Sequence, residues 1–437
     1  MRILRISYFL IMTAFASVSC AGNGGEIFTE DFNDSARTMG IWTDNSAEAQ
    51  GASVEFLAEG GIDGSGCVRI MNPERGSVGI SHTLSGLEPD RLYRMTAKIK
   101  CKGVGDGRGA VLFLAPDGLE QPWNASEFAY GDTDWLDCYM DFVPDRDGNA
   151  TICCALGFPW GTYNGGTASG EVMIDDVAVA EVNEAQMYFR SGEHISLAID
   201  RDKMCVPDSV ADRWLADMDK VYEAYEDLVG DAPYESRRIL VMTTPGIEPG
   251  YWALAGNPIL WNNHVGIDKL LMRTMENDDW NFGILHEIGH TFSPGTVCDN
   301  GRWNWNDEIF ANFRMSYALE VCNGAVSQRD VLYRGAEIKD YYKIFYDETI
   351  GQGIAKNNGD ALHYTFLRIK DKYGWDVYKN AFRSLYALDP KEMEHLNDDY
   401  QKMLFFLSHV SQAAGEDVTT TCYTKEELRL IEESLKK

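Results

Sequence analysis

The sequence is short of basic residues: 39 Lys and Arg stand against 68 Asp and Glu, and the formal net charge is −29. A nucleic-acid-binding protein needs a surplus of cationic side chains to neutralise phosphates. This chain lacks that surplus, so nucleic acid is excluded as a partner. Its 437 residues exceed the usual domain size of about 150 residues, so we expect two or three domains.

Long apolar runs are also missing, apart from one at the N-terminus, and we expect no transmembrane helix. Two arginines precede an apolar stretch at residues 6–18, a pattern typical of a signal peptide. The tetrapeptide Ser-Val-Ser-Cys that ends at Cys20 resembles a bacterial lipobox, in which the cysteine is lipidated. We therefore predict a lipoprotein signal peptide over residues 1–19 and a flexible tether over 20–25.

The resulting protein would be exported and anchored by lipid to a bacterial membrane. The outer membrane is the expected one, with the protein on its periplasmic side or at the cell surface. Without lipidation of Cys20, or with an ordinary secretory signal, it would be secreted.

Closely spaced cysteine pairs are absent: no Cys-x-x-Cys occurs, which argues against a cysteine-based zinc site. The nine cysteines after Cys20 are scattered, and we interpret most of them as small apolar core residues. One or two disulfides remain open in an exported protein. Cys153 and Cys154 adjoin in a strand-like run, so their side chains should point to opposite faces.

Short strand-like runs fill residues 26–182, and turns rich in Gly, Asp, Asn and Pro separate them. Alternating polar and apolar residues in several runs predict an all-β sandwich. The expected strands are Ser53–Leu57, Cys67–Met71, Tyr93–Ile99, Ala110–Leu114, Trp135–Phe142, Thr151–Leu156 and Glu171–Val179.

The ends of this region, Phe28–Phe32 with Trp42 and the closing Gly170–Val177, resemble the galactose-binding-like jelly rolls of carbohydrate-binding modules. The resemblance implies a jelly-roll sandwich with sugar-stacking aromatics and a structural calcium ion near the first and last strands. Candidates for stacking on sugars are Trp123, Trp160 and Tyr163, with packing at the core or its rim as the alternative. Candidates for holding calcium are Glu30, Asp31 and Asp175.

Near residue 186 the spacing of apolar residues changes from the alternation typical of strands to the three- and four-residue steps typical of helices. Strands are expected at Glu193–Ile199 and Arg238–Thr243, and helices at Asp208–Leu228, Asp360–Tyr373, Trp375–Leu388, Lys391–Ala414 and Lys425–Leu435. Strands followed by helices predict an α+β domain over residues 186–437. The chain is thus expected to be multidomain, with an all-β sandwich ahead of an α+β domain.

Residues 284–291 read Ile-Leu-His-Glu-Ile-Gly-His-Thr, and the pattern predicts a helix from Asn281 to Phe292. On a helix, His286 and His290 leave the same face one turn apart, so both imidazoles can bind one Zn²⁺. Glu287 would then lie beside the open coordination position and act as general base on zinc-bound water.

The third metal ligand distinguishes the classes of zinc peptidase. Position 296 is Thr, where a metzincin would have its third histidine. Glu308 begins the next predicted helix and is our preferred ligand, with compensation of the helix dipole as its alternative role. Its rival, Glu320, lies about three turns further along that helix. Asn312, one turn after Glu308, is placed to hydrogen-bond a ligand imidazole.

The motif His286–His290, the tryptophans that follow it and the Glu308-x-x-x-Asn312 pattern resemble the mucin- and enhancin-type gluzincin peptidases, metallopeptidase family sixty. Two flanking segments agree, Ala255–Ile259 and Leu362–Leu385, and the resemblance covers about residues 186–425. It implies a zincin-like catalytic domain with one zinc ion. It also implies cleavage of heavily O-glycosylated proteins such as mucins, which suits a sugar-binding domain ahead of the peptidase.

We therefore predict a zinc-dependent endopeptidase that hydrolyses mucin-like glycoproteins, with Glu287 delivering its proton to the leaving amine. Ala255–Leu260 is a candidate edge strand for pairing with the substrate backbone. His363 and Tyr364 are candidate oxyanion donors, with packing in the core as the alternative. Two other functions stay open: a non-catalytic glycan-binding surface lipoprotein and a glycoside hydrolase that uses paired carboxylates.

Overall fold

The computed structural model describes residues 26–105, 107–116, 120–159, 168–201, 206–247, 251–295, 297–298 and 302–436. The chain divides into two compact units. The first contains the residues up to Ala115 together with Trp123–Val182. The second contains Pro116–Pro122 and Asn183–Lys437.

Several predictions fall outside the described residues, namely the signal peptide, the tether with Cys20, and the aromatic residues Trp160 and Tyr163. They remain predictions. Within the described part of the chain, no helix is both long enough and apolar enough to cross a membrane.

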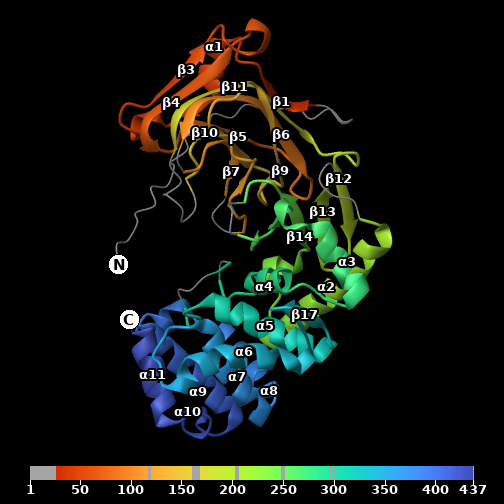
Figure 1. The fold of residues 1–437 in the computed structure, drawn as a ribbon, viewed down its shortest axis with the longest axis vertical. Helices are drawn as coiled ribbons and strands as arrows, with labels where there is room; N and C mark the ends of the chain where they lie inside the picture. The colour runs from red at the N-terminus through yellow and green to blue at the C-terminus, as the bar shows by residue number, and fades with distance from the viewer. Residues whose placement is uncertain are drawn as a thin grey trace. The chain divides into compact units, whose positions relative to one another are not determined.

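The first unit consists of two antiparallel sheets (Figure 1). One sheet has six strands in the order β3-β4-β11-β6-β9, with β1 also paired to β11, and the other has the order β2-β5-β10-β7-β8. The strands are β1 Glu26–Glu30, β2 Thr43–Asp44, β3 Ser53–Leu57, β4 Cys67–Gly76, β5 Val78–Leu84, β6 Tyr93–Gly105, β7 Ala110–Ala115, β8 Asn124–Ala125, β9 Leu136–Phe142, β10 Ala150–Leu156 and β11 Ala168–Glu181. The prediction of N-terminal all-β sheets is confirmed.

The alternation of side chains sets which residues form the core of this unit. On β6, Met95, Ala97 and Ile99 are buried between the sheets, while the residues between them are less buried. On β10, Cys154 belongs to the same core and Cys153 to a smaller apolar cluster on the other face, as predicted. The described cysteines are all free thiols. A short helix, α1 Ser35–Ile41, was not expected; the Asp34 side chain caps it.

The second unit begins with a five-stranded sheet in the order β12-β13-β14-β16-β15. Its central strands, β13 Ile195–Asp200, β14 Ile239–Thr244 and β16 Ile259–Asn262, are parallel. The edge strands β12 Met187–Ser191 and β15 Ala253–Leu254 run antiparallel to their neighbours. The segment expected as an edge strand, Ala255–Leu260, is therefore wrong in its bounds: the edge is β15, and β16 lies one strand further in.

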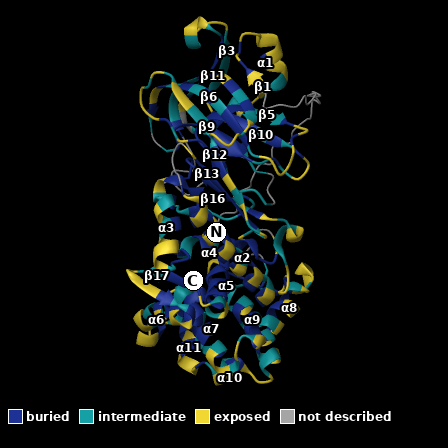
Figure 2. Cartoon of the chain, turned by 90° about the vertical axis from the view of Figure 1, so that its right-hand side faces the viewer, coloured by how far each residue is buried: buried dark blue, intermediate teal, exposed yellow. Residues whose placement is uncertain are grey.

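Helices make up most of the rest, together with the hairpin of β17 Ala325–Gln328 and β18 Val331–Arg334. They are α2 Asp208–Val229, α3 Ile267–Asn277, α4 Phe282–Thr291, α5 Asp307–Cys322, α6 Ile338–Glu348, α7 Gly359–Tyr373, α8 Asp376–Tyr386, α9 Asp399–Ala414, α10 Val418–Thr421 and α11 Lys425–Leu435. Figure 2 shows their buried faces in dark blue and the exposed outer turns in yellow. This helical part matches the expected α+β order of elements.

One predicted helix, Lys391–Ala414, is interrupted in the structure. A short 3₁₀ turn at Pro390–Met393 is closed by a capping box between Asp389 and Glu392. The helix α9 then starts afresh at Asp399, because the Asp398 side chain accepts a hydrogen bond from Gln401 N at 2.7 Å. The two acidic caps thus divide a segment that hydrophobic periodicity alone predicted as one helix.

The helices α4 and α5 pack so closely that their contact admits no side chain at Gly289. A Cβ atom there would lie 2.8 Å from Ala311 O and 3.0 Å from Ala311 Cα. On its other side α4 is tied to α2, since Tyr225 Oη donates to Leu285 O at 2.8 Å. This packing holds the helix that bears the paired histidines against the helix that begins at Asp307.

Candidate metal centre

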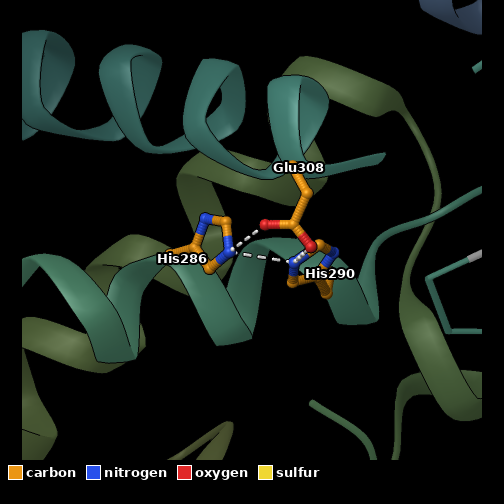
Figure 3. A group of neighbouring side chains, drawn as sticks. All are labelled: His286, His290 and Glu308. Carbon is orange, nitrogen blue, oxygen red and sulfur yellow. Dashed lines mark hydrogen bonds and ion pairs between the residues drawn. The ribbon is translucent and has the colours of Figure 1, made fainter. Parts of the chain in front are cut away.

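His286 and His290 lie one turn apart on α4, whose first turn is capped by Asn281. Figure 3 shows their imidazoles turned toward each other and toward Glu308, which comes from the start of the facing helix. The two Nε2 atoms are 3.0 Å apart. The helical spacing predicted from the sequence thus brings two potential metal ligands to one point.

Glu308 lies in the first turn of α5, where Asn306 caps the helix by accepting from Glu308 N at 3.1 Å. Its carboxylate is 3.0 Å from His286 Nε2 and 3.5 Å from His290 Nε2. Hydrogen bonds from His286 and His290 hold the pKa of Glu308 well below its usual range. Glu320, the rival candidate, instead pairs with Lys370 near the other end of α5.

The other ring nitrogen of each histidine has its own partner. His286 Nδ1 donates to Asn312 Oδ1 at 2.8 Å, and His290 Nδ1 donates to Asp307 Oδ2 at 2.7 Å. Because both partners are acceptors, Nδ1 carries a hydrogen in each ring, and loss of the hydrogen from Nε2 leaves there the lone pair that a metal needs. Two Nε2 atoms that lie 3.0 Å apart and face a carboxylate can together hold one cation.

This donor set fits zinc. Two imidazole nitrogens and one carboxylate oxygen are the protein ligands of many catalytic zinc sites, which leave a further position open. The local electrostatics agree: burial lowers the pKa of His290, but hydrogen bonds with Asp307, Cys298 and Glu308 outweigh it and raise that pKa well above its ordinary value. These groups therefore favour positive charge on His290.

Glu287 lies between the two histidines in sequence, beside the segment that links β15 to β16. Burial raises the pKa of its carboxyl group, whereas His286, His290 and a hydrogen bond from the backbone of Ala255 lower it, and the net shift is upward. The Ala255 contact connects the predicted base to the edge of the sheet.

Two residues near His290 were missed as functional candidates in the sequence. Asp307, at the start of α5, was not among the candidates, yet its buried carboxylate accepts a hydrogen bond from His290. Although burial works in the other direction, the charge of Arg314 and hydrogen bonds from His290 and Ser293 lower the pKa of Asp307. Cys298 also groups with His290 and Asp307. Nothing in a lone cysteine on a loop signals such a position.

The proposed oxyanion donors do not fit their role. His363 is 0% exposed, lies near Ser316 Oγ at 3.1 Å, and packs on Tyr342; its burial lowers its pKa to about 3. Tyr364 is buried against Tyr346, with ring centroids 4.9 Å apart. Their burial supports the alternative role kept for both residues, packing in the core, and argues against a contact with a substrate carbonyl.

In the first unit, Trp123 is half-buried and packs on Phe113 and Phe158, with centroids 5.9 and 5.5 Å away. It is thus in part a packing residue of the outer cluster. The candidate calcium ligands are split: Glu30 and Asp175 are buried, whereas Asp31 is exposed and accepts a hydrogen bond from Asn33 N.

Comparison with known proteins adds a family. A family model described as peptidase M60, enhancin and enhancin-like matches residues 181–423. Among curated proteins, none matches the chain. A functionally unknown conserved protein from Bacillus anthracis str. Ames is 14% identical, with 80% of this chain and 74% of that chain covered and a TM-score of 0.44.

The first unit is covered by a smaller structure, the CBM22-1 xylan-binding domain of Paenibacillus barcinonensis Xyn10C. It is 13% identical, with 38% of this chain and 99% of that chain covered and a TM-score of 0.27. With TM-scores this low, neither likeness bears on function.

Removing the Glu308 carboxylate should abolish tight zinc binding. Loss of a residue that merely orients a ligand typically weakens zinc affinity about 10- to 100-fold, so Glu308→Ala should lose at least as much. The matched control Glu320→Ala, on the same helix, should keep wild-type affinity. Zinc content after dialysis, together with a chelator competition, measures both. Equal affinity in the two variants would remove Glu308 from the site.

Proposed function

The chain belongs to the peptidase M60, enhancin and enhancin-like family, and from that premise we propose a zinc-dependent endopeptidase that cleaves O-glycosylated, mucin-like proteins. Membership makes the chain a metallopeptidase. The zinc assignment is carried by one observation: the Nε2 atoms of His286 and His290 face the Glu308 carboxylate while both Nδ1 atoms are already bonded.

Zinc held by these three side chains would supply Lewis-acid polarisation of the scissile carbonyl and would lower the pKa of water. The chain's own catalytic residue is Glu287, whose carboxylate takes a proton from the attacking water and delivers it to the leaving amine nitrogen. The backbone of Ala255 holds that carboxylate by a hydrogen bond. We propose that the sheet and helices around them form a zincin-like fold.

Substrate would bind along β15, which forms one edge of the sheet. An edge strand presents unpaired backbone groups that can pair with an extended peptide. Because Ala255 directly follows this strand and contacts Glu287, a peptide paired with Ala253–Leu254 would pass beside the proposed base. A substrate bound in this way would have its scissile bond within reach of the proposed metal centre.

Replacing Glu287 by Gln should lower kcat by at least about two orders of magnitude, the usual contribution of a general base. The amide keeps the size of the side chain but cannot accept the proton. Zinc content should stay at the wild-type value, since Glu287 is not among the proposed ligands. The exposed Glu276→Gln on α3 is the control and should keep full activity. Wild-type turnover in Glu287→Gln would rule out this residue as the base.

The preference for glycosylated protein is supported by the first unit, whose sequence resembles sugar-binding modules. Such a unit raises the local concentration of cleavable backbone around the peptidase unit. The net charge of −29 opposes sialylated or sulfated glycans. Sugar recognition must therefore come from aromatic stacking and hydrogen bonds, and we expect neutral glycans to be preferred.

Enzymatic removal of O-glycans from a mucin fragment should slow its cleavage, because the deglycosylated chain loses the groups that the protein recognises. Mass spectrometry of the products, with and without a chelator, measures the rate and the sites. A synthetic peptide made with and without its O-linked sugar is the matched pair. Faster cleavage of the bare peptide would leave a zinc peptidase without the glycoprotein preference.

We also propose a structural calcium ion in the first unit, near Glu30 and Asp175. Glu30 Oε1 accepts from Phe32 N and Thr38 Oγ1, but its buried Oε2 has no hydrogen-bond partner among the described residues. The turn at Gly61–Gly66 joins Asp175 to the segment after Glu30: Gly66 N donates to Asn33 Oδ1, and Asp175 Oδ2 accepts from Ile62 N. A buried carboxylate oxygen without a donor is costly unless a cation compensates it.

Adding Ca²⁺ to chelator-treated protein should raise the thermal midpoint of the first unit. At a hundredfold excess over its dissociation constant, a bound ion stabilises the folded state by about 2.7 kcal/mol. Glu30→Gln should remove this calcium response, whereas Glu59→Gln, at an exposed position, should keep it. An unchanged midpoint of the wild type in calcium would refute the site.

A further inference from the structure

Arg314 is a buried charged residue whose side chain makes no hydrogen bond or ion pair with the three proposed metal ligands. It lies in the middle of α5 and is 0% exposed. Burying a guanidinium costs several kcal/mol unless it is paired and hydrogen-bonded. Nη1 donates to Gly289 O at 2.8 Å and approaches Asp307 Oδ1 at 3.5 Å, and Nη2 donates to Tyr386 Oη at 3.1 Å. Each partner leads back to the segment that carries His290.

Asp307 is the link between Arg314 and the metal centre. Its Oδ2 accepts from His290 Nδ1 at 2.7 Å and from Ser293 Oγ, while its Oδ1 faces Arg314 and Asn304. The carboxylate therefore has one oxygen directed to the histidine and one to the buried cation. Such an arrangement fixes both the tautomer and the tilt of the imidazole ring.

The remaining partners of Arg314 hold the end of α4. Gly289 O belongs to the residue before His290, and Tyr386 Oη donates in turn to Phe292 O, two residues after it. Tyr386 is the last residue of α8. A single guanidinium thus ties α5 and α8 to the carbonyl groups on either side of His290.

The two histidines are held differently. His286 Nδ1 is bonded to the neutral amide of Asn312, whereas His290 Nδ1 is bonded to a carboxylate backed by a buried arginine. A carboxylate acceptor makes the opposite nitrogen a stronger donor to a metal than an amide acceptor does. The affinity of the site should therefore depend more on His290 and its partners.

We propose that Asp307 and Arg314 act together as a positioning pair that orients His290 for metal binding, although neither is a proposed metal ligand. The proposal rests on the zinc site of the proposed function. Asp307 directs the Nε2 atom of His290 toward the metal position. Arg314 holds Asp307 and the last turn of α4 in the positions that this orientation requires.

The test measures zinc affinity of the full chain by competition with a chromogenic chelator, alongside the visible spectrum of the Co²⁺-loaded protein. Asp307→Asn keeps an acceptor but loses the charge, and should weaken zinc binding about 10- to 100-fold. Arg314→Lys keeps the charge but loses the forked donor geometry, and should cause a smaller loss in the same direction. The double variant should lose less zinc affinity than the product of the two single-variant fold losses, since the two residues act as one unit.

The matched controls come from the buried pair Arg94–Asp141 of the first unit, which is bidentate at 2.7 and 2.8 Å. Asp141→Asn and Arg94→Lys perturb a similar pair far along the chain, and should leave zinc affinity and the Co²⁺ spectrum unchanged. The spectrum separates positioning from general destabilisation, because only a displaced ligand alters the cobalt bands. If Arg314→Lys does not fold, the zinc affinity and cobalt spectrum of Asp307→Asn alone test the proposal.

Zinc affinity of Asp307→Asn within twofold of wild type, with an unchanged cobalt spectrum, would overturn the proposal. The proposed function fails separately. If the wild-type protein binds zinc but cleaves no glycoprotein, the proposed function is refuted. The zinc affinities of the variants then still test the positioning pair. A wild-type protein that binds no zinc would overturn both.

Discussion

The contact between α4 and α5 is the constraint on which the proposed metal centre depends. One helix supplies His286 and His290, and the other supplies Glu308, so the distance between the two helices decides whether these side chains meet. Gly289 lets the helices approach until their backbones are in contact. A side chain at this position would push the two backbones apart, and with them His290 and Glu308.

Close packing alone would leave the imidazoles free to rotate, and the polar groups of α5 prevent this. In the first two turns of that helix, Asp307 and Asn312 each accept a hydrogen bond from one histidine, and Glu308 faces both. The helix therefore provides a ligand and two orienting groups within six residues. Burying so many polar groups is costly, and the hydrogen bonds of both Arg314 Nη atoms and of the Asp307 carboxylate offset part of that cost, while the buried Arg314 Nε has no partner among the described residues.

Much of the fold followed from local pattern. Alternation located strands such as Ser53–Leu57, and three- and four-residue spacing located helices such as Lys425–Leu435, because each pattern repeats many times within its own segment. Predictions went wrong where a few side chains override periodicity. The caps Asp389 and Asp398 divided one expected helix, and β15, two residues long, is too short to give any pattern.

The sequence by itself paired His286 with His290, since helical spacing fixes which residues share a face. It made Glu308 the preferred third ligand because that residue begins the next predicted helix, a short loop after His290. Tertiary structure alone decided the partners of those residues. No sequence pattern links Asp307 or Arg314 to His290, and only the packing of α5 against α4 and α8 brings them together. For His363 and Tyr364 the sequence left both a catalytic role and packing in the core possible, and only the tertiary structure shows that they are buried. Burial depends on contacts between segments far apart in the chain, which no local pattern records.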